Sequence, residues 1–256
     1  MISDKAVIDK SAVIAPNVEI SPFSIIGADV EIGEGTWIGP HAVINGPCKI
    51  GRNNKIFQFA SIGEDPQDKK YAGEPTRLEV GDNNTFRECT TVSRGTTSGG
   101  GLTRIGNNNL FMAYVHIAHD CLIGNDNIFA NNASLAGHVI VEDFVVMSGF
   151  SGVVQFCHMG SHSFAAMGSM VEKDVPPFVK VAGYCAKPFG LNTVGMKRRG
   201  FSTETMLNLR RAYKIIYRKG LTVKDAVEQL TLMLTECPEI QLFINFIQGS
   251  TRGIVR

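Results

Sequence analysis

Aliphatic residues recur at every sixth position along the first part of the chain. Isoleucine occupies all eleven such positions from 2 to 62: Ile2, Ile8, Ile14, Ile20, Ile26, Ile32, Ile38, Ile44, Ile50, Ile56 and Ile62. Glycine, asparagine, aspartate and proline are frequent between them. A period of six fits neither the 3.6-residue repeat of an α-helix nor the alternation of a single strand. It predicts a short strand and a tight turn, repeated as the walls of a prism.

The same period continues, with two interruptions, through most of the chain. It returns at Val80, Phe86 and Val92, shifts by one residue, and then runs through Ile105, Phe111, Ile117, Ile123, Phe129, Leu135, Val141, Met147 and Val153. Three walls of six residues make a coil of 18, so each inward side chain stacks on the residue 18 positions away, at a strand spacing of about 4.8 Å. The sequence therefore predicts a parallel β-helix over residues 1–182.

Two segments interrupt the period, at 64–77 (EDPQDKKYAGEPTR) and at 95–102 (GTTSGGGL). Long excursions from a regular scaffold are common places for binding residues. The alternative is that both are insertions tolerated without a function.

Helical signals replace the hexads after Pro188, so residues 183–256 are predicted to form a C-terminal α-helical domain. Ser202 and Thr222 have the pattern of helix N-caps, and Gly220 that of a helix end. The expected helices run from Ser202 to Gly220, from Thr222 to about residue 236, and from Pro238 to about Gln248.

Charge is unevenly distributed, although the net charge of the 256 residues is only +1. Residues 1–182 carry 13 Lys and Arg against 19 Asp and Glu, a net of −6, and residues 183–256 carry 12 against 5, a net of +7. The balance excludes a uniformly basic nucleic-acid coat, and we expect no nucleic-acid partner. The C-terminal quarter is a candidate surface for anionic partners; solvated helix faces are the alternative.

The cysteine pattern and the amino terminus point to a cytoplasmic protein. The six cysteines, at 48, 89, 121, 157, 185 and 237, include no close pairs, which argues against a disulfide scaffold or a structural zinc site. The first residues lack the features of a signal peptide, and no apolar run approaches the roughly 18 to 20 residues of a membrane span.

Three histidines are the strongest candidates for proton transfer. His116 and His119 lie together in HIAHDC, and the position 18 residues after His119 is Gly137, followed by His138. Two histidines and a glycine backbone should therefore meet on one edge of adjacent coils. Asp120 is placed to orient His119. The alternatives are a polar ladder that fills the turns and a zinc site built from the three histidines.

These residues belong to a longer series of motifs that resembles one family. HIAHDC, NNASLAGHV, QFCHMGSH, DVPPFV, KPFGLN, GMKRRGFS and STRG, with QDKKYAGEPTRLEVGD and RGTTSGGGLT, follow in the order and spacing of the UDP-N-acetylglucosamine acyltransferases of lipid A synthesis. The match covers essentially the whole chain. The resemblance implies a left-handed parallel β-helix of hexapeptide repeats with a C-terminal α-helical domain, whereas the usual crossover rule predicts the opposite hand.

The resemblance implies transfer of an (R)-3-hydroxyacyl group from acyl carrier protein to the 3-hydroxyl of UDP-N-acetylglucosamine, with no cofactor and no metal. By the same match, His119 is the general base, Asp120 its hydrogen-bonded partner and the N–H of Gly137 the oxyanion donor. Direct attack needs no covalent intermediate, so Cys121 is interpreted as a small buried turn residue.

Other residues match substrate contacts of the family. Those matched to the sugar nucleotide are Asp68, Lys70, His116, His138 and Gln155, and those matched to the phosphopantetheine and phosphates are Asn192, Arg198 and Arg199. Val154, Cys185 and Val194 depart from the family pattern, so the contacts at these positions are expected to differ. The family works as a homotrimer with active sites between neighbouring chains.

Met167 falls where the family sets acyl length, and its size predicts a shorter donor such as 3-hydroxydecanoyl. The alternative is that Met167 points into the prism.

Two other functions remain open from the sequence. One is the related N-acyltransferase of the same pathway, a family that carries a large amino-terminal domain before its hexads, whereas the hexads of this sequence begin at Ile2. The other is a non-catalytic scaffold or carrier-protein binding module.

Overall fold

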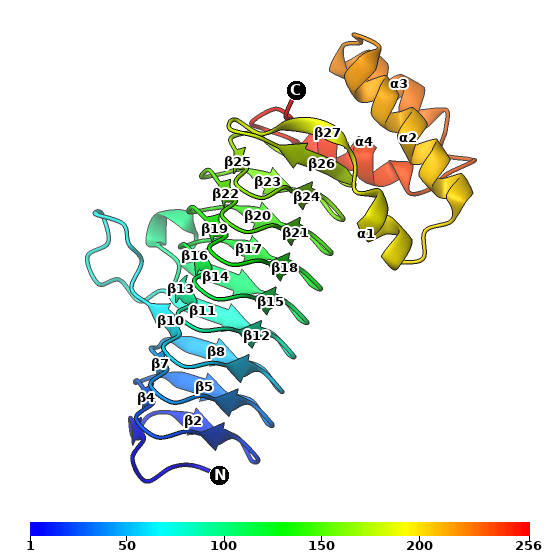
Figure 1. Ribbon diagram of the computed structural model, residues 1–256. Helices are drawn as coiled ribbons and strands as arrows, with labels where there is room; N and C mark the ends of the chain where they lie inside the picture. Colours follow the sequence, from blue (N-terminus) through cyan, green and yellow to red (C-terminus); the bar gives the residue numbers. More distant parts are fainter.

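The chain winds into a three-walled prism with helices gathered at its carboxyl-terminal end (Figure 1). The structure, a computed structural model, describes residues 1–256. Each wall is a parallel sheet in which neighbouring strands come from successive coils, and only the last strand pair is antiparallel. The chain passes through the first, second and third walls in this order in every coil.

The strands are two to five residues long and fall into three sheets. The first wall contains β1 (Val7–Ile8), β4 (Ile25–Ile26), β7 (Val43–Ile44), β10 (Ser61–Glu64), β13 (Thr91–Ser93), β16 (His116–Ile117), β19 (Ser134–Leu135), β22 (Gly152–Val153) and β25 (Met170–Val171). The second wall contains β2 (Val13–Ile14), β5 (Val30–Ile32), β8 (Cys48–Ile50), β11 (Arg77–Val80), β14 (Leu102–Ile105), β17 (Leu122–Ile123), β20 (Ile140–Val141) and β23 (His158–Met159). The third wall contains β3 (Glu19–Ile20), β6 (Trp37–Ile38), β9 (Lys55–Ile56), β12 (Thr85–Phe86), β15 (Leu110–Phe111), β18 (Ile128–Phe129), β21 (Val146–Met147), β24 (Phe164–Ala165), β26 (Val179–Ala182) and β27 (Lys187–Leu191).

The register confirms the 18-residue coil that the hexads predict. Ile8 pairs with Ile26, and Leu135 with Val153. The offset becomes larger only across the two interruptions, where Ile62 pairs with Val92 and Val92 with Ile117. Each interruption therefore adds residues between two strands without adding a wall.

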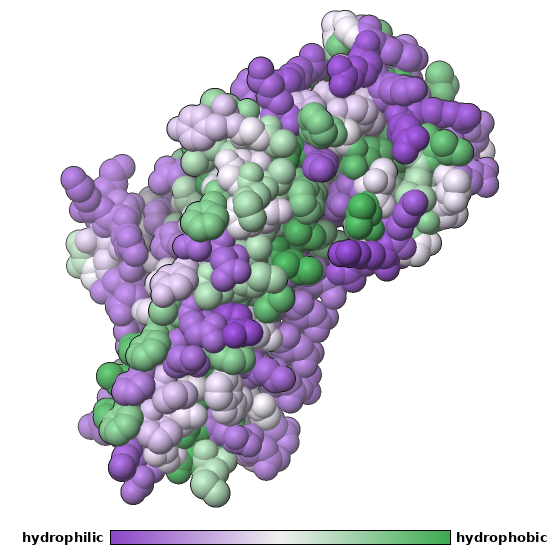
Figure 2. Space-filling model, in the orientation of Figure 1, coloured by the Kyte–Doolittle hydropathy of each residue, from purple (hydrophilic) through white to green (hydrophobic).

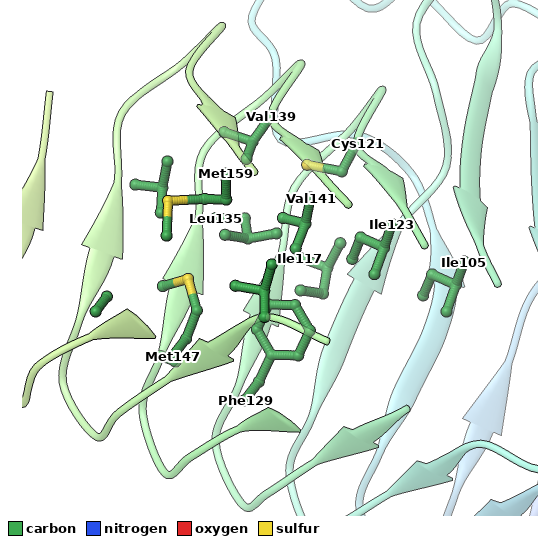
Figure 3. Packing of buried hydrophobic residues seen from close by; sticks show 14 of the residues in the cluster. Ile105, Ile117, Cys121, Ile123, Phe129, Leu135, Val139, Val141, Met147 and Met159 are labelled. Atoms are coloured by element: carbon green, nitrogen blue, oxygen red, sulfur yellow. The ribbon is translucent and has the colours of Figure 1, made fainter. Parts of the chain in front are cut away.

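The hexad side chains from all three walls meet inside the prism. Figure 3 shows Ile117, Ile123 and Phe129 pointing toward the same interior space from the first, second and third walls. Phe129 stacks on Phe111, with ring centroids 4.9 Å apart, and Phe111 on Phe86 at 4.8 Å. The outward residues next to these core positions are left free to form surface columns along each wall.

The corners of the prism use left-handed backbone conformations. At the corner between the first and second walls the residues with positive φ include Asp120 (φ 59°), His138 (φ 62°) and Phe156 (φ 64°), which are 18 positions apart. Asparagine and aspartate tolerate this region better than other residues with a side chain. Because the corner repeats in each coil, side chains at this edge lie in a column.

The helices follow the last coil. They are α1 (Thr193–Arg198), α2 (Thr203–Arg218), α3 (Val223–Thr231) and α4 (Ile240–Gly249), and a short 3₁₀ helix, η1 (Thr97–Gly99), lies in the second interruption. Ser202 and Thr222 cap α2 and α3, as their sequence patterns predict. β27 and α1 were not expected, because a strand of five residues and a helix of six are too short for a periodic signal. None of the helices combines the length and apolarity needed to span a membrane.

The pH dependence of folding can be tested at His162. Its ring lies between those of Phe144 and Phe178, at 4.7 and 5.4 Å, with Phe201 edge-on at 5.1 Å. Burial, assisted by the charge of Arg199, lowers the pKa of His162 to about 4. Between pH 4 and the ordinary value of 6.5 the unfolded chain therefore binds a proton that the folded chain does not, so stability falls as the pH is lowered.

We expect the midpoint of thermal unfolding to fall further between pH 7 and pH 5 in the native protein than in His162→Phe, which keeps the aromatic stack but cannot titrate. Scanning calorimetry of both proteins at the two pH values measures the difference. Equal falls would show that His162 contributes nothing to the pH dependence.

Candidate active site

His119 lies at the corner between the first and second walls, two residues after the end of β16. Gly137 occupies the equivalent position of the next coil. A Cβ atom built on Gly137 would lie 2.5 Å from Cε1 and 2.7 Å from Nε2 of His119. The imidazole ring therefore lies directly against the backbone of Gly137, and only glycine leaves room for it. The 18-residue spacing predicted this meeting of histidine and glycine.

His119 and Asp120 form a buried hydrogen-bonded pair. The distance from Nδ1 of His119 to Oδ2 of Asp120 is 2.7 Å, and the two side chains are only 9% and 2% exposed. A carboxylate can only accept in this bond, so Nδ1 carries the proton and Nε2 presents its lone pair. The pair is arranged for His119 to act as a base through Nε2.

Asp120 is held in place by the second interruption. Its carboxylate accepts hydrogen bonds from the backbone N–H of Thr96 at 2.8 Å and from the Thr96 hydroxyl at 2.6 Å. The backbone N–H of Asp120 donates to Oγ1 of Thr103 at 2.8 Å. These bonds fix the carboxylate that orients His119, so the 95–102 segment has a role in the site.

His116 and His138 flank His119 as neutral side chains at pH 7. Burial is the main cause that lowers the pKa of both; His119 adds to this effect, and at His138 the charge of Asp120 opposes it. Nδ1 of His116 lies 2.7 Å from the hydroxyl of Thr91. The His138 ring lies edge-on to His119 at 5.1 Å and stacks on Phe156 at 4.4 Å. Both rings can exchange hydrogen bonds with a substrate without adding charge to the site.

Two adjoining cavities open at His119. One, of about 560 Å³, follows the outer face of the first wall, and the other, of about 630 Å³, lies under the first interruption. Both are lined by Gln67, His119 and Gln155. The first is lined further by His116, Ala118, Ser134, Leu135, Ala136, Gly137, Gly152, Val153, Val154 and Met170, and the second by Asp68, Lys69, Lys70, Ser98, His138 and Phe156. The first is the more apolar, and the second is mainly polar. Figure 2 shows that the first interruption, which projects on the left, is hydrophilic at its tip.

Within one chain the structure brings together most of the predicted site residues, but not all. Those that gather are His119, Asp120, Gly137, His116, His138, Gln155, Asp68 and Lys70. Met167 is at the corner between the third and first walls, 74% exposed, and does not point into the prism. Val154 lines the cavity beside Gln155, whereas Cys185 and Val194 are outside both cavities.

Asn192, Arg198 and Arg199 are also distant from His119 in the same chain. Asn192 is buried and caps α1, and its amide donates to the carbonyl oxygen of His162 at 3.0 Å. The guanidinium of Arg199 lies 4.3 Å from the centre of the Phe144 ring, at the corner between the second and third walls. In Figure 1, α1 and the first interruption lie on opposite sides of the prism.

Several residues of the site were not predicted. Met170, Gly152 and Ser134 continue the outer column that starts at His116, and their register in steps of 18 was a usable signal. Gln67 and Thr96 lie in the interruptions, where no repeat assigns a direction to a side chain. They are identified only by the folded structure.

Cys121, next to Asp120, is not suited to be a nucleophile. It is fully buried, and burial raises the pKa of its thiol to about 12. Its Sγ donates to the carbonyl oxygen of Ala136 at 3.3 Å. This agrees with its interpretation as a small buried turn residue.

One group of side chains could bind a metal ion, since its ligand atoms lie within 4.8 Å of one another: His119, Asp120 and His138. Two of these atoms, Nδ1 of His119 and Oδ2 of Asp120, are already paired at 2.7 Å. A metal ion bound to both would have to replace this hydrogen bond.

Gly137→Ala is expected to lower turnover about tenfold to a hundredfold, since the added methyl displaces the His119 ring and a shift of about 1 Å in a reacting group has effects of this size. Steady-state kinetics measures the loss. Gly249→Ala is the control, because a Cβ built on Gly249 has no neighbouring atom within 4 Å. Full turnover in Gly137→Ala would contradict this placement of His119.

Comparison with known proteins assigns the chain to a family. Residues 174–255 match the family model of domain 2 of UDP-N-acetylglucosamine O-acyltransferase, and residues 29–56 and 102–137 match that of the bacterial transferase hexapeptide. The solved UDP-N-acetylglucosamine acyltransferase of Francisella novicida is 45% identical, with a TM-score of 0.97 over 100% of this chain and 94% of that one. LpxA of Acinetobacter baumannii is 49% identical (TM-score 0.98, 100% and 99% covered), and LpxA of Bacteroides fragilis 42% identical (TM-score 0.97, 100% of both covered). The chain belongs to the UDP-N-acetylglucosamine acyltransferase family.

Membership of the UDP-N-acetylglucosamine acyltransferase family confirms three predictions made from the sequence. The resemblance itself is correct, the chain is an acyltransferase, and its β-helix is left-handed with a helical C-terminal region. The alternative of a scaffold or binding module without catalysis is therefore excluded. The family model of an O-acyltransferase also favours transfer to oxygen over the N-acyltransferase.

Proposed function

We propose that this acyltransferase moves an (R)-3-hydroxyacyl group from acyl carrier protein to the 3-hydroxyl of UDP-N-acetylglucosamine, the first step of lipid A synthesis, in the cytoplasm. The observation that carries the proposal is the His119–Asp120 pair, which presents Nε2 to two joined cavities of different polarity. The relatives named as UDP-N-acetylglucosamine acyltransferases support the choice of acceptor.

The pair supports direct transfer. Nε2 of His119 removes the proton of the sugar hydroxyl as its oxygen attacks the thioester carbonyl carbon. Asp120 stabilises the imidazolium that forms. When the tetrahedral intermediate collapses, the C–S bond breaks and the leaving thiolate takes the proton from Nε2. The sugar ester and free thiol are the products, so the reaction needs neither a cofactor nor an acyl-enzyme.

The backbone of Gly137 fits the role of oxyanion donor. Its N–H donates no hydrogen bond within the chain, and its Cα lies against the His119 ring. A free backbone N–H beside the base is suited to an oxygen that becomes negative during attack.

The two cavities suggest where each substrate binds. The polar cavity, with Asp68, Lys70 and His138, is assigned to the sugar nucleotide. The apolar cavity, which runs along the first wall from His116 to Met170, is assigned to the acyl chain. The net charge of +7 on residues 183–256 is suited to attract an acidic carrier protein.

A homotrimer would complete the site. Asn192, Arg198 and Arg199 match residues that bind phosphates, yet in one chain they are separated from His119 by the second wall. A neighbouring copy can supply them if the active site lies between two chains. Each site would then combine His119 of one chain with the arginines of another.

Complementation tests this arrangement. We expect His119→Ala mixed with the double variant Arg198→Ala, Arg199→Ala to recover turnover after joint refolding, since some interfaces then carry intact residues from both sides. His119→Ala mixed with Asp120→Asn is the control and should stay inactive, because both residues come from the same chain. Absence of recovery in the first mixture, with a monomer in sedimentation, would contradict the trimer.

The function itself is tested by acyl transfer to UDP-N-acetylglucosamine from a panel of (R)-3-hydroxyacyl carrier proteins of different chain lengths. We expect turnover of the native protein with at least one donor and formation of a 3-O-ester, identified by mass spectrometry and NMR. Binding of both substrates without turnover would refute the proposed reaction.

A further inference from the structure

The guanidinium group of Arg94 is buried at the base of the first interruption. Its side chain is only 8% exposed. Nη1 donates to the carbonyl oxygen of Gly63 at 2.6 Å, and Nη2 contacts the carboxylate of Asp65 and the hydroxyl of Tyr71, the latter at 3.2 Å. A buried charge is costly unless it is paired, so these contacts define one position for the group.

The partners of Arg94 bracket the part of the loop that faces the active site. Gln67, Asp68 and Lys70 line the polar cavity, and all three lie between Asp65 and Tyr71 in the sequence. The Tyr71 hydroxyl also donates to the carbonyl oxygen of Glu74 at 3.0 Å. One side chain therefore ties both ends of the cavity-lining segment to the prism.

Arg94 is also close in sequence to the residue that holds the base. Two positions later, Thr96 donates two hydrogen bonds to the Asp120 carboxylate. The backbone N–H of Arg94 donates to the carbonyl oxygen of Glu64 at 2.9 Å, so this segment is itself fixed to the first interruption. Residues 94–96 therefore contact both the binding loop, through Arg94, and the Asp120 carboxylate, through Thr96.

We propose that Arg94 is a positioning residue that holds Gln67, Asp68 and Lys70 in place for the sugar nucleotide. The inference rests on the proposed function, because it takes the polar cavity as the nucleotide site. Arg94 touches neither cavity and acts only through the loop. Its loss should therefore weaken nucleotide binding and leave the chemical step at His119 almost unchanged.

The experiment compares variants on both sides of the contact. Asp65→Asn and Tyr71→Phe alter the loop side of the contact and keep the Arg94 side chain, and Arg94→Lys keeps the charge with fewer donors. Arg104→Lys is the control, because Arg104 pairs with Glu79 on the exposed face of the second wall. Steady-state kinetics gives KM for UDP-N-acetylglucosamine and kcat for each protein.

We expect KM for the nucleotide to rise about tenfold in Asp65→Asn and Arg94→Lys, as for the loss of one hydrogen bond to a charged group, with kcat within about twofold of native. Arg104→Lys should behave as native. An unchanged KM, or equal losses in KM and kcat, would overturn the inference.

Hydrogen exchange separates this result from a failure of the proposed function. The Tyr71 amide donates to the carbonyl oxygen of Asp68 at 3.0 Å and reports loop order without any substrate. We expect its protection to fall about tenfold in Asp65→Asn, with native protection in the core strands. If the native protein showed no turnover, this measurement would still test whether Arg94 holds the loop in place. Unchanged protection in Asp65→Asn would refute that role.

Discussion

His119→Ala is expected to lower kcat by roughly 10² to 10⁴-fold, the contribution of a positioned general base. The reason is that Nε2 of His119 is the free nitrogen of the one imidazole that is oriented by a buried carboxylate. Nδ1 is bonded to Asp120 at 2.7 Å, and Nε2 lies against Gly137, where both cavities meet. KM for the two substrates should change much less, because their binding groups lie elsewhere in the cavities.

Stopped assays with saturating UDP-N-acetylglucosamine and acyl carrier protein measure the loss. His41→Ala is a matched control, since His41 is exposed at another corner, where it stacks between Phe23 and Phe59 at 5.2 and 5.4 Å. The control should retain native kcat. If His119→Ala kept more than about a tenth of native turnover, His119 would not be the base.

The prism was predictable because each hexad has one apolar residue at the same position, and that residue points inward. Ile117 and Leu135 are buried, and the outward neighbours His116 and Ser134 are paired by the same register. A change of one residue in register would turn a whole row of aliphatic side chains outward. The repeat therefore determines both the wall and the direction of each side chain.

The 18-residue spacing predicted the contact between His119 and Gly137 but not the residues of the interruptions that complete the site. It placed His119 on Gly137, and extended by one coil it would have placed Phe156 on His138. It could not find Thr96, because the second interruption has no period that relates its residues to Asp120.

Contacts between chains are also outside what the repeat can define. Asn192 was expected near phosphates by resemblance, yet within its own chain it is a buried helix cap. Its amide oxygen accepts from the N–H of Gly195 at 3.1 Å, and its amide nitrogen donates to the carbonyl oxygen of His162 at 3.0 Å, so both ends of the side chain are used within the chain. The predicted roles of Asn192, Arg198 and Arg199 therefore remain predictions.

The second large effect concerns the length of the acyl chain. Met167→Gly is expected to raise the preference for a 14-carbon over a 10-carbon donor by roughly 200-fold in kcat/KM. Four more methylenes can then be buried, each worth about 0.8 kcal/mol. Met167 is 74% exposed at the corner beside the first wall, where its Cε would lie 3.7 Å from a Cβ on Gly149. A side chain in this place can meet a ligand that leaves the apolar cavity between two copies of the chain.

Met170→Gly is the decisive comparison, because Met170 lines the cavity itself and lies over Gly152. If the chain passes Met170 and ends at Met167, this variant should alter kcat/KM for both donors by similar factors and leave their ratio near the native value. If the ratio instead changes with Met170→Gly and not with Met167→Gly, the acyl chain ends inside the cavity of one chain. The length limit would then belong to Met170, and its position 54 residues after His116 in the outer column would be the sequence feature that encodes it.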